Sequence, residues 1–216
     1  MFAVYTIGST LIVDIEETAS RAQMPIAAGI RNMDVPSQLS PSVPLYDHRT
    51  VPAAVLALPF LVPLFTPADR QSGAEEAMGV GFSSALTLVD PTAIVPTKTA
   101  FGEGCYVNAG VILGAGSRFG RFVVINRATT IGHHAVVEDF ASFGPGVVIA
   151  GNVTIGRGAM IGAGAVILPD LSVGANAVVG AGTVVTKDVP PHSQVIGNPA
   201  RITKTDISGF KGKSVI

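Results

Sequence analysis

The chain has 216 residues, of which 48% are hydrophobic and only 13% charged, and its formal net charge is −1. This size suits one repeat domain with a small companion, and the low charge argues against the clustered basic face of a nucleic-acid-binding protein. The most apolar stretch, 51–65, is too short and too rich in proline to span a membrane, and the first residues lack the basic region of a signal peptide. The single Cys105 cannot form a disulfide framework. We therefore expect a cytoplasmic protein.

The N-terminal third, residues 1–86, has the pattern of a small α/β unit. The predicted strands cover 2–7, 25–30 and 60–65, and the predicted helices cover 11–22 and 69–78. We expect Thr10 to be the N-cap of the first helix. The segment 32–50 is rich in Pro, Ser and Asp and is predicted to be loop. A β-α-β start of this kind is typical of a Rossmann-like subdomain.

From residue 89 to residue 185, every sixth residue is a branched aliphatic or a phenylalanine. Neither a helix nor an ordinary strand has this period, which therefore indicates an internal repeat. The positions are Val89, Val95, Phe101, Val107, Leu113, Phe119, Ile125, Ile131, Val137, Phe143, Ile149, Ile155, Ile161, Ile167, Val173, Val179 and Val185. A small residue usually precedes each of these anchors by two positions, and glycine often follows directly. We interpret each hexad as a short strand and a corner, where glycine would allow backbone angles that a Cβ resists.

Four strings add a more specific pattern to the repeat. They are LTLVDPTAIV at 86–95, INRATTIGHH at 125–134, AGNVTIG at 150–156 and GNPARI at 197–202. Together with the hexads, they resemble the bacterial hexapeptide-repeat acyltransferases. The order of a small α/β unit before the repeat is similar to the branch that contains sialic acid O-acetyltransferases and nucleotide-amino-sugar N-acetyltransferases.

The resemblance implies a left-handed parallel β-helix in which three hexads make one triangular coil. It implies a small α/β Rossmann-like subdomain over 1–86, a β-helical acyltransferase domain over 87–202 and a C-terminal tail over 203–216. Few charges and many apolar residues also suggest buried subunit faces. The resemblance to the family implies a homotrimer with active sites between subunits.

Acyl transfer needs a base for the attacking amine or hydroxyl and a donor for the oxyanion, and histidine is the usual base near neutral pH. In the run 125–134, His133 matches the position of the family's active-site histidine. Three hexads, or one coil, after His133 comes Gly151, whose backbone N–H could reach a thioester oxygen without a side chain in the way. The family's glycine in the AGNVTIG string has that role.

Two further residues of the active-site run leave alternatives open. His134 stands where the family often has Asp or Glu beside the catalytic histidine, so Asp139 or Glu138 could orient His133 instead, or the base could be less polarised. Asn126 matches a family asparagine. Because Asn108 precedes it by three hexads, Asn126 could equally belong to an asparagine ladder at the corners.

Binding of acetyl-CoA needs backbone donors and a few cations, and the family binds it along the later coils. The candidates are Gly151, Gly162, Ala163, Gly180, Lys187 and Arg201. The candidate substrate-binding turn after the first strand is Gly8, Ser9 and Thr10, which is shorter than the family's Gly-x-Gly-Gly-His turn. The short turn predicts that residues 1–86 alone bind a nucleotide sugar weakly or not at all, and Ser9 and Thr10 could simply cap the helix.

We therefore predict a metal-independent, acetyl-CoA-dependent acetyltransferase that acts on an amine or hydroxyl of a sugar or nucleotide-linked sugar, in surface polysaccharide biosynthesis. The alternatives are a non-catalytic β-helix scaffold, a transferase that has lost its sugar site and, third, a zinc enzyme of the γ-carbonic anhydrase kind. The zinc enzyme needs three histidine ligands. Adjacent residues of a strand point to opposite sides, which argues against a shared metal at His133 and His134.

Overall fold

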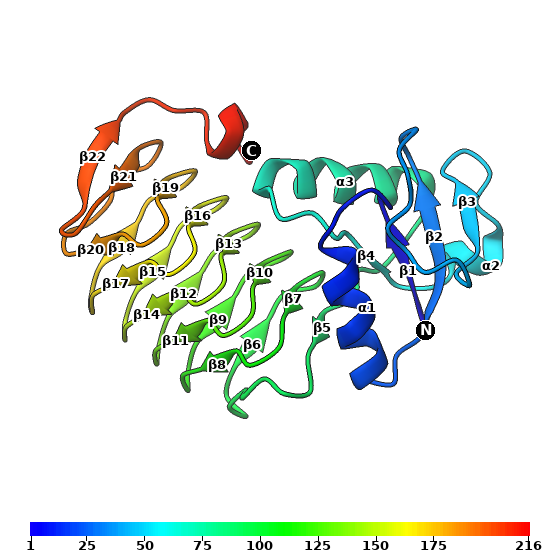
Figure 1. Ribbon diagram of the computed structural model, residues 1–216, viewed down its shortest axis with the longest axis horizontal. Helices are drawn as coiled ribbons and strands as arrows, with labels where there is room; N and C mark the ends of the chain where they lie inside the picture. Colours follow the sequence, from blue (N-terminus) through cyan, green and yellow to red (C-terminus); the bar gives the residue numbers. More distant parts are fainter.

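Sixteen two-residue strands stack into a three-sided prism that forms the C-terminal part of the molecule (Figure 1). The computed structural model describes residues 1–216. Each strand ends on one of the hexad anchors and pairs in parallel with the strand one coil away, as Ile125 does with Phe143. The predicted left-handed β-helix with three hexads per coil is confirmed.

The three faces of the prism are three sheets whose strands all run parallel, except for the last strand of the first face. The first face contains β5 (Leu88–Val89), β7 (Tyr106–Val107), β10 (Val124–Ile125), β13 (Ser142–Phe143), β16 (Met160–Ile161), β19 (Val178–Val179), β21 (Gln194–Ile196) and β22 (Arg201–Lys204). The second face contains β8 (Ile112–Leu113), β11 (Thr130–Ile131), β14 (Val148–Ile149), β17 (Val166–Ile167) and β20 (Val184–Val185). The third face contains β6 (Ala100–Phe101), β9 (Arg118–Phe119), β12 (Val136–Val137), β15 (Thr154–Ile155) and β18 (Ser172–Val173). We call the edge between the first and second faces the first corner. The edge between the second and third faces is the second corner, and the edge between the third and first faces is the third corner.

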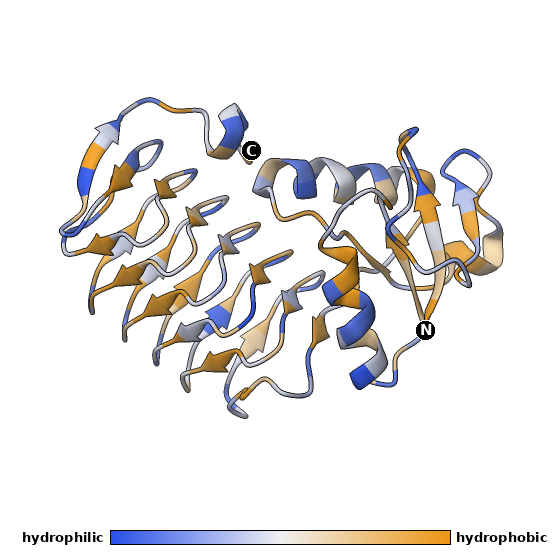
Figure 2. Cartoon of the chain, in the orientation of Figure 1, coloured by the Kyte–Doolittle hydropathy of each residue, from blue (hydrophilic) through white to orange (hydrophobic).

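The interior of the prism is a continuous apolar core made of the anchors and the small residues two positions before them, including Cys105. Figure 2 shows the corresponding apolar colour along the strands of the coils. The anchor Val95 is not buried in this core and is 36% exposed. Its segment forms no strand, only an isolated bridge between Ile94 and Ile112. The first coil is therefore less regular than the later ones.

The glycines after the anchors are needed for a different reason than the one we predicted. None of them has a positive φ; the left-handed corner positions come two residues later, for example at Gly116 and His134. A Cβ at Gly132 would instead lie 2.5 Å from the carbonyl carbon of Ala150 in the next coil. The close stacking of coils, and not the corner angle, requires glycine there.

The N-terminal subdomain is a four-stranded parallel sheet with strand order β3-β2-β1-β4. Its strands are β1 (Phe2–Tyr5), β2 (Ile26–Arg31), β3 (Leu45–Asp47) and β4 (Phe60–Leu61), and its helices are α1 (Ile12–Arg21), α2 (Ala53–Leu56) and α3 (Pro67–Val80). The small Rossmann-like arrangement is confirmed. β3 lies inside the segment predicted to be loop, because pairing with β2 extends a stretch that has no strand pattern of its own.

Thr10 is not the N-cap of the first helix, so that prediction was wrong. Leu11 holds the N-cap position without a side-chain hydrogen bond, and α1 begins at Ile12. The hydroxyl of Ser9 instead accepts a hydrogen bond from the Leu11 N–H at 3.2 Å, which closes the turn before the helix. Ser9 thus has the local role of a turn former.

Arg70 of α3 joins the subdomain to the prism. Its side chain is fully buried. The guanidinium donates hydrogen bonds to the carbonyl oxygens of Phe122 (2.7 Å) and Phe140 (2.8 Å) at the third corner and to the Ser142 hydroxyl (2.9 Å). It also donates to the carbonyl oxygens of Leu64, Phe65 and Ala141. Burial lowers the pKa of Arg70 to about 9, so it stays charged at neutral pH.

Asp90 makes a second buried connection between the two parts. Its carboxylate accepts hydrogen bonds from Arg21 (2.6 Å) and Thr18 (2.8 Å) of α1 and from the Thr92 N–H (2.9 Å). Burial alone would raise the pKa of Asp90, but these hydrogen bonds outweigh it and hold the pKa well below its usual range. The subdomain therefore packs on the first face of the prism.

The last residues fold back from the far end of the prism to the subdomain (Figure 1). After β22 the chain runs to a short 3-10 helix, η1 (Phe210–Gly212), and Val215 packs in the apolar cluster that also contains Phe60 and Phe122. No helix in the chain combines the length and the apolar character needed to cross a bilayer.

Candidate active site

His133 and His134 lie together on the second corner, between β11 and β12. His134 occupies the left-handed corner position with φ of 56°, and both side chains are exposed. Their Nδ1 atoms are 3.0 Å apart, and their rings meet edge to face with centroids 5.1 Å apart. The expectation that the two side chains point to opposite sides was wrong, because these residues form a turn and not a strand.

The 3.0 Å contact between the two rings constrains their protonation. One Nδ1 must carry a hydrogen and donate a hydrogen bond to the other, which accepts it. When His133 donates, its Nε2 carries a free lone pair and can accept a proton from a substrate. His134 then orients His133 as a neutral acceptor, at the place where the resembling family often has a carboxylate.

The two acids that we considered as alternative partners of His133 are engaged at the third corner. Asp139 accepts a hydrogen bond from the Arg121 N–H at 2.8 Å, and Glu138 accepts one from the Arg157 N–H at 2.8 Å. Neither has a hydrogen bond to His133, so the alternative in which one of them orients this ring was wrong.

The His133 ring lies directly against Gly151 of the next coil. A Cβ at Gly151 would come within 2.6 Å of the ring's Nε2 and Cε1 atoms. The carbonyl oxygen of His133 accepts a hydrogen bond from the Asn152 N–H at 2.9 Å, which fixes the spacing of the two corners. The Gly151 N–H has no acceptor within the chain. The second corner therefore combines a candidate base with a free backbone donor.

Asn126 lies on the first corner and is separated from His133 within one chain. Its Oδ1 accepts hydrogen bonds from Asn108 Nδ2 at 3.0 Å and from the Arg127 N–H at 2.8 Å. Arg127 in turn forms an ion pair of 2.6 Å with Asp14 of α1. The asparagine ladder is present, and it ties this corner to the subdomain.

The candidate residues for the acyl donor occupy two different corners. Gly162, Ala163 and Gly180 follow strands of the first face and lie on the first corner. Lys187 follows β20 and lies on the same edge as His133, three coils further along. It lines a cavity of about 420 Å³ together with Arg201.

Gly8, Ser9 and Thr10 line a cavity of about 470 Å³ in the subdomain. It lies beyond the carboxyl ends of β1 and β4, where the strand order reverses and open α/β sheets bind ligands. Thr6, Thr66, Phe210 and Lys211 are further lining residues, which sequence reasoning missed. No local signal could have found the last two, because they arrive from the C-terminal tail.

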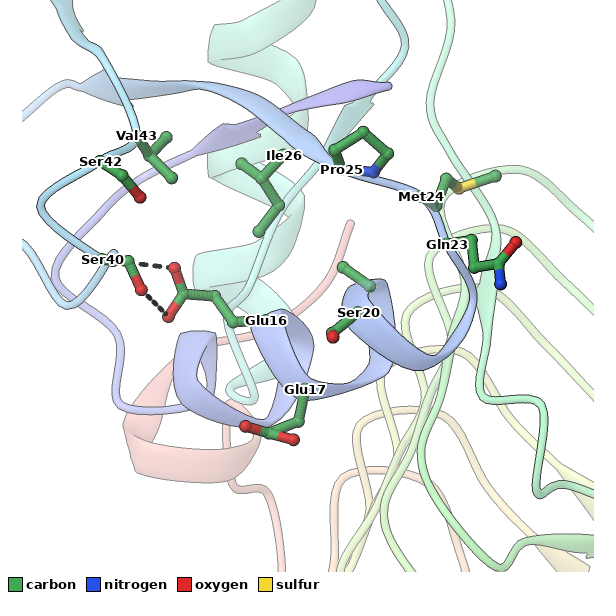
Figure 3. A pocket seen from close by; sticks show the side chains of 11 residues that line it. Glu16, Glu17, Ser20, Gln23, Met24, Pro25, Ile26, Ser40, Ser42 and Val43 are labelled. Atoms are coloured by element: carbon green, nitrogen blue, oxygen red, sulfur yellow. Dashed lines mark hydrogen bonds between the residues drawn. The ribbon is translucent and has the colours of Figure 1, made fainter.

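A further cavity, of about 530 Å³, lies elsewhere in the subdomain, between α1 and the segments 23–26 and 40–43 (Figure 3). The carboxylate of Glu16 points across it and accepts hydrogen bonds from the N–H (2.8 Å) and the hydroxyl (3.0 Å) of Ser40. None of the predicted site residues lines this cavity, and its one polar network holds a loop in place.

Within one chain, the histidines do not come together as a set of metal ligands. The chain contains no group of three or more His, Cys, Asp or Glu side chains placed to hold a metal ion. His48 and His192 lie apart from the pair, with their Nδ1 atoms near the carbonyl oxygens of Arg31 and Ile207.

Comparisons with known proteins agree with this geometry. The family model of the bacterial transferase hexapeptide (six repeats) matches residues 152–187. No curated protein sequence matches the chain. Among solved structures, a histidine mutant of perosamine N-acetyltransferase from Caulobacter crescentus, in complex with CoA and GDP-perosamine, is 28% identical, with a TM-score of 0.84 over 94% of this chain and 97% of that one.

Two other solved structures have the same architecture. The acetyltransferase domain of PglB from Neisseria gonorrhoeae, in complex with acetyl coenzyme A, is 26% identical, with a TM-score of 0.83 over 93% of this chain and 98% of that one. WeeI from Acinetobacter baumannii is 24% identical, with a TM-score of 0.80 over 94% and 99% of the two chains, and it shares the fold.

The coiled prism and these matches show that the chain has the hexapeptide-repeat β-helix fold and is similar to the hexapeptide-repeat acyltransferases. Within that class, its α/β subdomain followed by the β-helix is similar to the sugar N-acetyltransferases over nearly the whole chain.

Proposed function

We propose that the chain transfers an acetyl group from acetyl-CoA to an amine or hydroxyl of a nucleotide-linked sugar, and that His133 and Gly151 carry the chemistry. The contact between the His133 ring and Gly151 is the observation that carries this proposal. Similarity to enzymes solved with CoA, acetyl coenzyme A and GDP-perosamine supports the donor and the substrate class.

The reaction follows from the position of the two groups. His133 Nε2 takes the proton of the attacking amine or hydroxyl as its lone pair adds to the thioester carbonyl carbon. The Gly151 N–H donates a hydrogen bond to the oxyanion that forms. When the tetrahedral intermediate collapses, the carbon–sulfur bond breaks, and the proton held by His133 passes to the departing thiolate of CoA. His133 is neutral again after one turnover.

The second face of the prism supports assembly into a trimer. Its outward side chains include Ile94, Ile112 and Val148, which are 61%, 44% and 43% exposed. Three prisms that turn this face toward a common axis would cover these apolar side chains. In that arrangement the second corner of one copy lies beside the first corner of the next.

A trimer would also unite the residues that one chain keeps apart. His133, Gly151 and Lys187 on one copy would face Gly162, Ala163 and Gly180 on the next, and the groove between them would hold CoA along the later coils. Threefold symmetry would bring Asn126 and the α1 edge of the neighbour to the level of His133. The candidate acceptor site is therefore complete only between two subunits.

The assembly can be tested by sedimentation at micromolar concentration. We expect the wild-type chain to sediment as a trimer and Ile112→Glu to sediment as a monomer, because three like charges cannot be buried together at the axis. Thr154→Glu on the exposed third face is the matched control and should remain trimeric. A monomeric wild-type chain would refute both the trimer and the shared site.

The subdomain cavity at Gly8, Ser9 and Thr10 is the proposed place of the nucleotide part of the substrate. The segments that precede α1 and α3 both line it, and helix N-termini favour phosphate groups. Its wall is completed by residues 210–211 of the tail, which agrees with weak binding by residues 1–86 alone. We propose that the enzyme acts in the cytoplasm, which contains both nucleotide sugars and acetyl-CoA, and that it serves the synthesis of surface polysaccharide.

Release of CoA thiol from acetyl-CoA tests the activity. We expect release to depend on an added UDP- or GDP-linked amino sugar and to persist in EDTA, because no step needs a metal. Calorimetric titration should show CoA binding in the same buffer. Binding that is lost in EDTA and restored by zinc would contradict the proposal, and CoA binding without transfer to any such sugar would favour a scaffold.

A further inference from the structure

Paired side-chain amides hold the C-terminal tail, one from the third corner of the prism and one from α3 of the subdomain. The Asn176 amide donates to the Val215 carbonyl oxygen (3.1 Å) and accepts from the Val215 N–H (2.8 Å). The Gln71 amide makes the same pair of hydrogen bonds with Ile216, at 3.0 and 3.1 Å. Four such bonds over two residues fix the position of the preceding 3-10 helix, η1.

The η1 segment places Phe210 and Lys211 on the wall of the cavity that contains Ser9 and Thr10. The Lys211 Nζ lies 5.7 Å from the centre of the Phe210 ring. Lys211 has φ of 56°, a backbone conformation that is uncommon for a side chain of this size. The neighbouring contacts of the tail hold it there.

The cavity also contains a polar group without a partner. Thr6, at the end of β1, is only 3% exposed, and its Oγ1 makes no hydrogen bond within the chain. Its φ of 70° is rare for a β-branched residue and is typical of functional sites. Thr6 is among the residues that line the cavity, and an unpaired buried hydroxyl of this kind is uncommon in folded proteins.

The charges around the cavity leave one cation free. Asp69, in the first turn of α3, is neutralised by an ion pair of 2.5 Å with Lys213. Lys211 lines the same cavity but has no acidic partner and no side-chain hydrogen bond. A diphosphate in this cavity would therefore meet two helix N-termini and one uncompensated ammonium group.

We propose that Lys211, carried by the C-terminal tail, binds the diphosphate of the nucleotide-linked substrate together with the N-termini of α1 and α3. This inference rests on the proposed function. The turn Gly8-Ser9-Thr10 is short and offers few backbone N–H groups to phosphate, and the tail supplies the missing positive charge. Substrate affinity thus depends on a segment that starts at the opposite end of the prism.

The test is calorimetric titration of the full-length chain with UDP and with GDP, at low and moderate salt. We expect Lys211→Met to weaken binding of the better ligand by about tenfold to a hundredfold, the usual effect of losing a charged hydrogen bond. The salt dependence of the remaining binding should also become weaker. Lys98→Met, an exposed lysine in the first coil without an ion pair, is the matched control and should bind like wild type.

The outcomes separate this inference from the proposed function. Equal binding by Lys211→Met and wild type, while wild type still transfers acetyl groups to a nucleotide sugar, would overturn the role of Lys211 alone. A loss of CoA affinity with unchanged UDP and GDP affinity would overturn it too, because Lys211 would then serve the donor's diphosphate. Failure of wild type to bind either nucleoside diphosphate would refute both the inference and the nucleotide-linked substrate.

Discussion

Replacing His133 with alanine is expected to lower kcat by about 10²- to 10⁴-fold, the usual cost of losing a general base. The fold should remain intact, because the His133 side chain is exposed on the second corner and takes no part in the core of the prism. The thiol-release assay with saturating acetyl-CoA and sugar measures the effect. A melting temperature equal to that of wild type would confirm that the loss is chemical.

His134 provides the discriminating comparison. His134→Ala should cost less than His133→Ala, because it removes only the acceptor that orients the His133 ring at 3.0 Å. His134→Asp should retain most activity, since aspartate tolerates the left-handed backbone and restores an acceptor. An inactive His134→Ala beside a nearly normal His133→Ala would show that the roles are reversed and that Gly151 is not the oxyanion donor.

Replacing Arg70 with methionine is expected to lower the free energy of unfolding by about 2–6 kcal/mol. Methionine preserves length and apolar volume but leaves buried carbonyl oxygens at Phe122 and Phe140 without a donor, and each such group costs about 1–3 kcal/mol. Urea unfolding at a fixed protein concentration measures the difference. The backbone amides of α3 and of the third corner should also lose their protection against hydrogen exchange together.

Arg118→Met is the control for Arg70→Met. Arg118 is exposed on the third face and makes no ion pair, so its loss should change stability by less than about 0.5 kcal/mol. If Arg70→Met were as mild as Arg118→Met, the hydrogen bonds of Arg70 would contribute little, and the subdomain would depend on its apolar contacts alone.

The coils could be predicted from the sequence because each hexad repeats one local arrangement. A large anchor and a small residue at a fixed offset determine which side chains point inward, and counting three hexads per coil is enough to place Gly151 beside His133. The subdomain was predicted less fully. β3 and α2 are short elements that depend on their neighbours, and helix α1 starts after Leu11 and not after Thr10.

The details of the site depend on geometry that a linear pattern does not contain. Whether His133 and His134 diverge or meet depends on their place in a turn, where His134 has a left-handed backbone. The approach of Lys211 to Ser9 joins residues from opposite ends of the chain, and no short-range pattern predicts it. Separation of Asn126 from His133 likewise follows from the corner that each occupies, which depends on counting faces of the prism.

A β-helix of identical coils has no intrinsic length, because each completed coil ends in the same unpaired strand edges on which another coil can pair. In this chain the step changes at the end: Val179 pairs with Val195, so the last turn is shorter than the others. The chain then reverses, and β22 runs antiparallel beside β21, with Val195 opposite Ile202. An antiparallel strand cannot continue the parallel ladder, and it covers the edge of the first face that a second molecule could otherwise extend. The break in periodicity thus keeps the molecule finite and protects it against end-to-end growth into fibres.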